Sequence, residues 1–180
     1  MEALNYKYLP HYVYDEYVLW EGNWELIHGV PYAMAPSPSV PHQSINALII
    51  SQLAVNLAGC GICRALMPVD YKIADDTVLQ PDALVMCEPY DKGNFITKAP
   101  EIVFEILSPA TRQKDTNLKY DLYEKAGVKY YIIVDPLKKT CSVYKLVNAN
   151  YELTLKTASD KFHFDLGPCS FDFDFGKIWE

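Results

Sequence analysis

Positive charge is scarce in this sequence. Its 180 residues include 16 Lys and Arg against 23 Asp and Glu, so the formal net charge is −7 at pH 7. Proteins that bind duplex DNA tightly and without sequence preference usually carry the opposite excess, so binding of that kind is not expected here. The deficit still permits a locally basic site, because clustered acids at a metal centre add to the negative total.

Long apolar runs are also missing. The most apolar segment, residues 45–58, contains polar residues and is too short to span a bilayer. The N-terminus lacks the positively charged and then apolar stretches of a signal peptide, so we expect a cytoplasmic protein without membrane contact. No repeat, low-complexity tract or linker divides the chain, and its length and 50% hydrophobic content predict a single domain over residues 1–180.

Cysteines are few and odd in number. Five are scattered along the chain, and without a secretion signal we expect them to be reduced thiols. Cys60-Gly61-Ile62-Cys63 has CxxC spacing, but no second Cys pair or His pair completes a zinc set. Redox motifs of this spacing normally lie where a strand meets a helix, whereas this one follows an expected helix. We therefore interpret these residues as ordinary buried or turn cysteines.

Hydrophobic patterning predicts a mixed order of helices and strands. Helices are expected over residues 42–58 and from Ser108–Thr111 to Gly127. The first of them is apolar on most faces, so it is either deeply buried or forms an oligomer contact, most simply in a homodimer. Strands are expected near residues 24–30, 32–34, 62–67, 69–73, 78–87, 101–107 and 129–134, and as a hairpin of residues 141–146 and 151–156.

Two acids interrupt strongly apolar, strand-like runs. They are Asp82, in Gln80-Pro81-Asp82, and Glu105, in Val103–Leu107. An ionised carboxylate in such a run is costly unless a metal ion, a cation or a proton compensates it. Two carboxylates can hold Mg²⁺, and such a metal supports phosphodiester hydrolysis.

A lysine on the second helix is a candidate partner for these acids. At about 100° per residue, Lys119 lies at the edge of the core-facing stripe that contains Leu118 and Leu122. From there its ammonium group could orient a water or neutralise charge in a transition state. A purely structural alternative is a buried Lys119–Glu105 ion pair, or an Asp115–Lys119 pair that supports the helix.

The order of these motifs resembles that of the Uma-two family of nucleases, which have the restriction-endonuclease-like PD-(D/E)XK fold. The resemblance covers residues 12–155. It is carried by Trp24–Gly29, His42, Gln80–Asp82, Pro100–Pro109, Thr111, Asp115, Lys119, Tyr123, Gly127-Val128 and Tyr130–Pro136.

The resemblance implies an α/β fold with a central mixed β-sheet flanked by helices and extended by β-hairpins. It also implies a Mg²⁺- or Mn²⁺-dependent endonuclease whose substrate is DNA. The metal ligands would be Asp82, Glu105 and the backbone carbonyl of Ile106, with Glu25 and Lys119 completing the catalytic set. Leu107 stands two residues after Glu105, where the broader superfamily has lysine, so in this family the lysine role has moved to Lys119.

Other interpretations remain open for several of these residues. Glu25 could be an exposed strand residue, and His42 could cap or pack a helix rather than contact a phosphate or a metal-bound water. Asp115 could position Lys119 or serve no further role, whereas Asp135 is interpreted as a structural turn residue. The competing function is a catalytically inactive nuclease-like fold that binds nucleic acid or protein.

Overall fold

The computed structural model describes residues 10–34, 38–90 and 92–179. The absence of a signal peptide is predicted from residues 1–10, of which residues 1–9 lie outside the described residues. Within them, no helix combines the length and the apolar character needed to cross a membrane.

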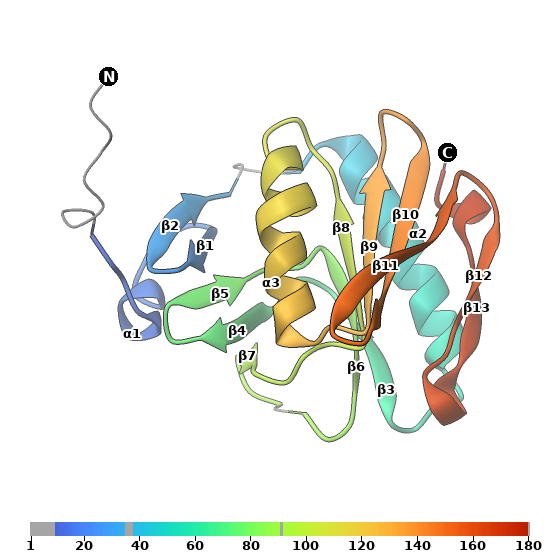
Figure 1. The fold of residues 1–180 in the computed structure, drawn as a ribbon, viewed down its shortest axis with the longest axis horizontal. Helices are drawn as coiled ribbons and strands as arrows, with labels where there is room; N and C mark the ends of the chain where they lie inside the picture. The colour runs from blue at the N-terminus through green and yellow to red at the C-terminus, as the bar shows by residue number, and fades with distance from the viewer. Residues whose placement is uncertain (1–9, 35–37, 91, 180) are drawn as a thin grey trace.

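Two large β-sheets form the framework (Figure 1). The first has the order β2-β1-β5-β4-β7 and the second β11-β10-β9-β8-β6-β3, while β12 and β13 form a separate pair. Their bounds are β1 Trp24–Ile27, β2 Val30–Ala33, β3 Cys63–Leu66, β4 Asp70–Ala74, β5 Thr77–Leu79, β6 Ala83–Cys87, β7 Phe95–Ile96, β8 Ile102–Ile106, β9 Tyr130–Asp135, β10 Thr140–Val147, β11 Asn150–Thr157, β12 Lys161–Phe164 and β13 Phe171–Asp174.

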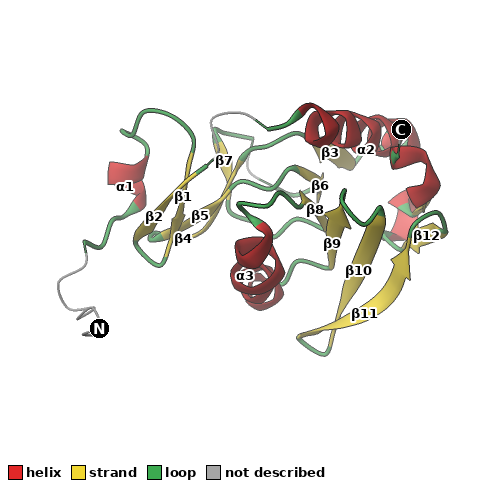
Figure 2. Ribbon diagram, turned by 90° about the horizontal axis from the view of Figure 1, so that it is seen from above, coloured by secondary structure: helices red, strands yellow, loops and turns green. Residues whose placement is uncertain are grey.

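Helices cover both faces of the six-stranded sheet. Figure 2 shows α2 (Val40–Leu57) on one face and α3 (Lys119–Ala126) on the other. The sheet is mixed, because β8 and β9 are parallel whereas its other neighbouring strands are antiparallel. This arrangement confirms the expected fold class. The remaining short helices are α1 (Tyr14–Tyr17), η2 (Lys114–Leu118), η3 (Gly167–Cys169) and η4 (Phe175–Ile178).

Side-chain alternation in β8 determines the position of Glu105. Ile102, Phe104 and Ile106 pack into the core on the α2 side, and Val103 packs into the core on the α3 side. Successive strand residues point to opposite faces, so Glu105 projects toward α3. The strand is buried throughout, and the carboxylate of Glu105 therefore lies within the protein rather than on its surface.

The prediction of one continuous strand over residues 78–87 is wrong. The structure divides it into β5 and β6, which belong to different sheets, and Gln80-Pro81-Asp82 lies between them. Proline has no backbone N–H to donate to a strand ladder, so the chain leaves one sheet here and enters the other. Asp82 therefore lies at a junction between strands, not inside a strand.

The second predicted helix begins irregularly. Residues Lys114–Leu118 form a π-helical turn, η2, before regular α3 starts at Lys119. In this turn the N–H of Lys119 donates to the carbonyl of Lys114, five residues earlier. Gly127 ends the helix as expected, with a positive φ of 85° that glycine adopts readily.

The expectation of reduced thiols is wrong for four of the five cysteines. The structure pairs Cys60 with Cys169 and Cys63 with Cys87 in disulfides, while Cys141 is free and buried. Cys60 and Cys169 are 109 residues apart in the sequence, and their proximity arises only when the C-terminal β12–β13 pair packs beside α2. Spacing along the chain could not reveal that contact.

Candidate active site

Lys119 lies at the centre of a buried charge cluster. Its side chain is 2% exposed, and its Nζ lies 2.7 Å from Glu25 Oε1 and 2.7 Å from Glu105 Oε1. Asp115 Oδ1 is 3.7 Å away. The residues come from β1, β8, η2 and α3, so one ammonium group joins both sheets to the helix. The contact between Lys119 and Glu105 anticipated from the helical wheel is present.

Both carboxylate oxygens of Glu25 are engaged by other groups. It is fully buried, and its Oε1 accepts a hydrogen bond from the backbone N–H of Gln80 at 3.0 Å. Lys119 contacts the same oxygen, and Lys114 contacts Oε2. The interpretation of Glu25 as an exposed residue is therefore wrong. Glu25 forms ion pairs with both Lys114 and Lys119.

Sequence reasoning missed Lys114 because of the π-helical turn. In a regular α-helix, side chains five residues apart point about 140° away from each other. The i→i+5 pairing in η2 widens the turn, so Lys114 and Lys119 reach the same carboxylate. Helical-wheel analysis at 100° per residue cannot anticipate this alignment.

Burial and charge act against each other in setting the pKa values of the cluster. Burial lowers the pKa of Lys119, but Glu105, Glu25 and Asp115 outweigh burial and hold it well above its usual range. Burial raises the pKa of Glu25, yet Lys119 and Lys114 bring it below its usual value. Glu105 has one lysine rather than two, and burial raises its pKa well above the usual range.

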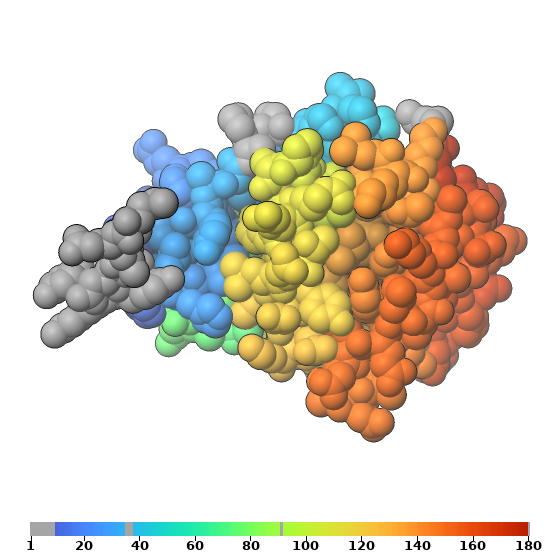
Figure 3. Space-filling model, turned by 45° about the horizontal axis from the view of Figure 1, so that its top comes forward, coloured from blue at the N-terminus to red at the C-terminus, as the bar shows by residue number. Residues whose placement is uncertain are grey.

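Two tyrosines secure the cluster from the α3 side. The hydroxyl of Tyr123 donates to Glu105 Oε1 at 2.7 Å, and that of Tyr131 donates to the backbone carbonyl of Asp115 at 2.8 Å. Both rings are fully buried, so these tyrosines pack within the core. Figure 3 shows the surface of the η2–α3 region, in yellow, between the N-terminal strands and the later strands in orange.

Asp82 forms a separate group beside this cluster. Its Oδ2 accepts a hydrogen bond from the backbone N–H of Ile106 at 2.7 Å and lies 3.3 Å from His42 Nε2. Burial lowers the pKa of His42, but Asp82 and an acceptor on the Ile106 backbone raise it above its usual value. Within the described residues, no hydrogen bond or ion pair joins Asp82 to Glu25, Glu105 or Lys119. The acids and the lysine singled out in the sequence therefore form two neighbouring groups, one around Lys119 and one around Asp82, rather than a single cluster.

The donor atoms fit a divalent cation. Lys119 and Tyr123 both contact Oε1 of Glu105, so neither occupies Oε2, and the two contacts of Asp82 both use Oδ2, which leaves Oδ1. The negative charge of Asp82 contributes to the raised pKa of Glu105, so the two acids interact electrostatically. Carboxylate oxygens are the ligands that Mg²⁺ prefers.

The charges in the region also favour a cation. Four carboxylates, those of Glu25, Asp82, Glu105 and Asp115, lie beside three basic side chains, those of Lys114, Lys119 and His42. Three buried side-chain atoms, His42 Nδ1, Asn46 Oδ1 and Asp115 Oδ1, make no hydrogen bond within the described part of the chain. The carboxylates outnumber the basic side chains, so the region suits a cation.

An ion pair at the end of β9 fixes the start of the lysine-bearing helix. Arg112 donates to both carboxylate oxygens of Asp135, at 2.8 and 3.0 Å. Asp135 Oδ1 also accepts hydrogen bonds from the backbone N–H groups of Leu137 and Lys138. Asp135 is thus the structural residue expected from its place before Pro136, and it additionally anchors the segment leading to η2.

The two-sheet architecture recurs in a solved structure. A crystal structure described as "a putative nuclease belonging to DUF820", from Anabaena variabilis, superposes with a TM-score of 0.75, at 20% sequence identity, over 93% of this chain and 97% of that chain. The profile of the Uma2 family, described as "Putative restriction endonuclease", matches residues 14–163, and the chain belongs to this family. A search of curated protein sequences found no match.

Replacing the central lysine should destabilise the fold. Lys119→Met leaves buried carboxylates without their shared cation, and breaking a buried pair in this way costs about 3–5 kcal/mol. We expect urea unfolding to show this loss, and to show a smaller loss in Lys119→Met/Glu105→Gln because one of the orphaned charges is gone. The exposed Lys125→Met on the same helix serves as the control, and an equally stable Lys119→Met would contradict the account.

Removing the Asp135 carboxylate should change acid stability. Its hydrogen bonds with Arg112 hold the pKa of Asp135 below its usual value, which is about 3.9. The stabilisation is therefore complete above that value and is lost as pH falls through the folded-state pKa. Urea unfolding of wild type and Asp135→Asn should differ by a constant amount between about pH 7 and pH 5, and converge in stronger acid. A difference that persists unchanged in strong acid would exclude this linkage, and Asp121→Asn is the surface control.

Proposed function

We propose that this protein is a divalent-metal-dependent endonuclease that hydrolyses phosphodiester bonds in DNA. The observation that carries the proposal is the arrangement of Glu105. Lys119 and Tyr123 both contact Oε1 of Glu105, and neither contact uses Oε2. Family membership and the nuclease fold support the same function.

In this proposal Asp82, Glu105 and the backbone carbonyl of Ile106 would hold Mg²⁺ or Mn²⁺. Such an ion, when bound, supplies Lewis-acid polarisation of a phosphoryl oxygen. The N–H of Ile106 already holds Asp82, so the strand end that offers the carbonyl also orients the first acid. His42, beside Asp82, would contact the phosphate or a water at its edge.

Lys119 would provide electrostatic stabilisation during the reaction. Its ammonium group touches Glu105 and can orient the attacking water or neutralise charge that develops on the phosphoryl oxygens. Its high pKa keeps it protonated, so it acts as a cation and not as a base. Glu25 and Lys114 would act through Lys119, since Glu25 holds its position and Lys114 offsets the charge of Glu25.

The test is cleavage of supercoiled plasmid by the purified protein at low salt with Mg²⁺ or Mn²⁺. We expect cleavage that a chelator abolishes, and that falls at least about 100-fold in Asp82→Asn and in Glu105→Gln, the scale on which loss of one transition-state-stabilising group is measured. Asp121→Asn, an exposed acid on α3, should cleave like wild type.

A catalytically inactive fold predicts a different result. The wild-type protein would then cleave no DNA with either metal, and its thermal unfolding midpoint would be unchanged by them. Cleavage that is equal in wild type, Asp82→Asn and Glu105→Gln would instead reject the assignment of these residues.

A further inference from the structure

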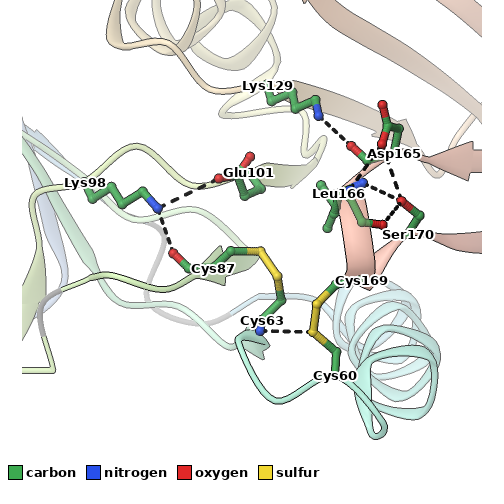
Figure 4. Close-up of a disulfide and its surroundings, with 11 residues drawn as sticks. Cys60, Cys63, Cys87, Lys98, Glu101, Lys129, Asp165, Leu166, Cys169 and Ser170 are labelled. Atoms are coloured by element: carbon green, nitrogen blue, oxygen red, sulfur yellow. Dashed lines mark hydrogen bonds and ion pairs between the residues drawn. A yellow bond between two sulfur atoms is a disulfide. The ribbon is translucent and has the colours of Figure 1, made fainter.

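The four disulfide-bonded cysteines form one cluster, far from the charge cluster around Lys119. Cys60 lies in the turn after α2, Cys63 begins β3, Cys87 ends β6 and Cys169 ends η3. Figure 4 shows the two disulfides side by side. Asp82 and Cys87 lie before the start and at the end of β6, about 16 Å apart along an extended strand.

The sulfur atoms are close enough to share one ion. Sγ of Cys60, Cys63 and Cys169 lie within 4.8 Å of one another, and they form the one such group of three or more Cys, His, Asp or Glu side chains that the described residues contain. Cys87 lies directly opposite Cys63 in the β3–β6 pair, with the Cα atoms 4.0 Å apart. Four sulfurs at about 2.3 Å from a tetrahedral Zn²⁺ are about 3.8 Å from one another, so small side-chain rotations would suffice.

The backbone of the CxxC turn is arranged as a thiolate ligand requires. The N–H of Cys63 donates to Sγ of Cys60 at 3.3 Å. A hydrogen bond to the charged form of a group favours that form, and such bonds orient and tune metal ligands. The fold thus supplies the second pair, Cys87 and Cys169, that the sequence around the CxxC motif lacks.

A lysine, Lys98, lies beside the cysteine cluster and would partly neutralise the negative charge of a zinc site there. A Zn²⁺ ion with four thiolates carries two net negative charges. Lys98 Nζ lies 2.7 Å from the backbone carbonyl of Cys87, and its pairing with Glu101 is long, at 3.9 Å. The ammonium group is therefore next to the cluster and only weakly engaged by Glu101 (Figure 4).

We propose that Cys60, Cys63, Cys87 and Cys169 form a structural Zn²⁺ site in the reduced protein, and that the two disulfides are its oxidised form. Reduction by two equivalents of a dithiol transfers four electrons and four protons to the two disulfides and gives four thiols. Binding of Zn²⁺ then releases the four protons as the thiolates coordinate the metal. In either form the cluster ties the C-terminal β12–β13 pair to α2, β3 and β6, and this role does not depend on the proposed nuclease activity.

The experiment measures metal in the full-length protein, purified anaerobically with a phosphine reductant and, in parallel, after oxidation. We expect one Zn²⁺ per reduced chain by elemental analysis and none per oxidised chain. Replacement by Co²⁺ should give the visible absorption of a tetrahedral cobalt thiolate. Cys60→Ser and Cys169→Ser should lose the metal and this absorption, whereas Cys141→Ser, at the buried free cysteine, should retain both.

Several results would overturn the proposal. A reduced wild-type protein with titratable thiols but no stoichiometric Zn²⁺ or cobalt thiolate absorption would leave the cysteines as a disulfide pair alone. Metal that persists in both Cys60→Ser and Cys169→Ser would place it elsewhere. If the serine variants do not fold, the wild-type cobalt spectrum, with its loss on oxidation, decides the question.

Discussion

The burial of Lys119 among carboxylates is the constraint on which the rest of this structure depends. An isolated buried ammonium group is prohibitively costly, and the fold compensates it with one acid from each sheet and a third from the preceding turn. The five-stranded sheet, the six-stranded sheet and α3 must therefore meet at one point. Breaking any one of these pairs would leave a charge inside the protein.

The same constraint explains why the helix begins irregularly. A regular α-helix would direct Lys114 away from Lys119, and Glu25 would then face one lysine instead of two. The π-helical turn brings both lysines to Glu25, and they lower the pKa of Glu25 whereas the pKa of Glu105 stays raised. Two buried acids that share a lysine thus have pKa values shifted in opposite directions, and the acid with the raised pKa is the one proposed to bind a metal.

Much of the fold and part of the site could be predicted from local patterns. Alternation in residues 101–107 places Glu105 on the face opposite Phe104, and the helical wheel correctly brings Lys119 to Glu105, because both depend on regular backbone. Where the backbone is irregular, prediction fails. Pro81 moves Asp82 out of a strand and toward His42, and the turn at Lys114–Leu118 hides Lys114. The cysteine cluster depends on a contact across 109 residues, which no local pattern contains.

The central proposal is that Lys119 takes the role that the broader superfamily gives to a lysine two residues after the strand acid. Leu107 holds that position and is buried beside Leu122 and Tyr123. The most direct measurement compares Lys119→Met with Lys119→Met/Leu107→Lys, in urea stability and in plasmid cleavage, with Lys119→Met/Leu107→Met as the size control. The account predicts that the lysine at position 107 restores part of both properties. A double variant no better than Lys119→Met or the size control would contradict it.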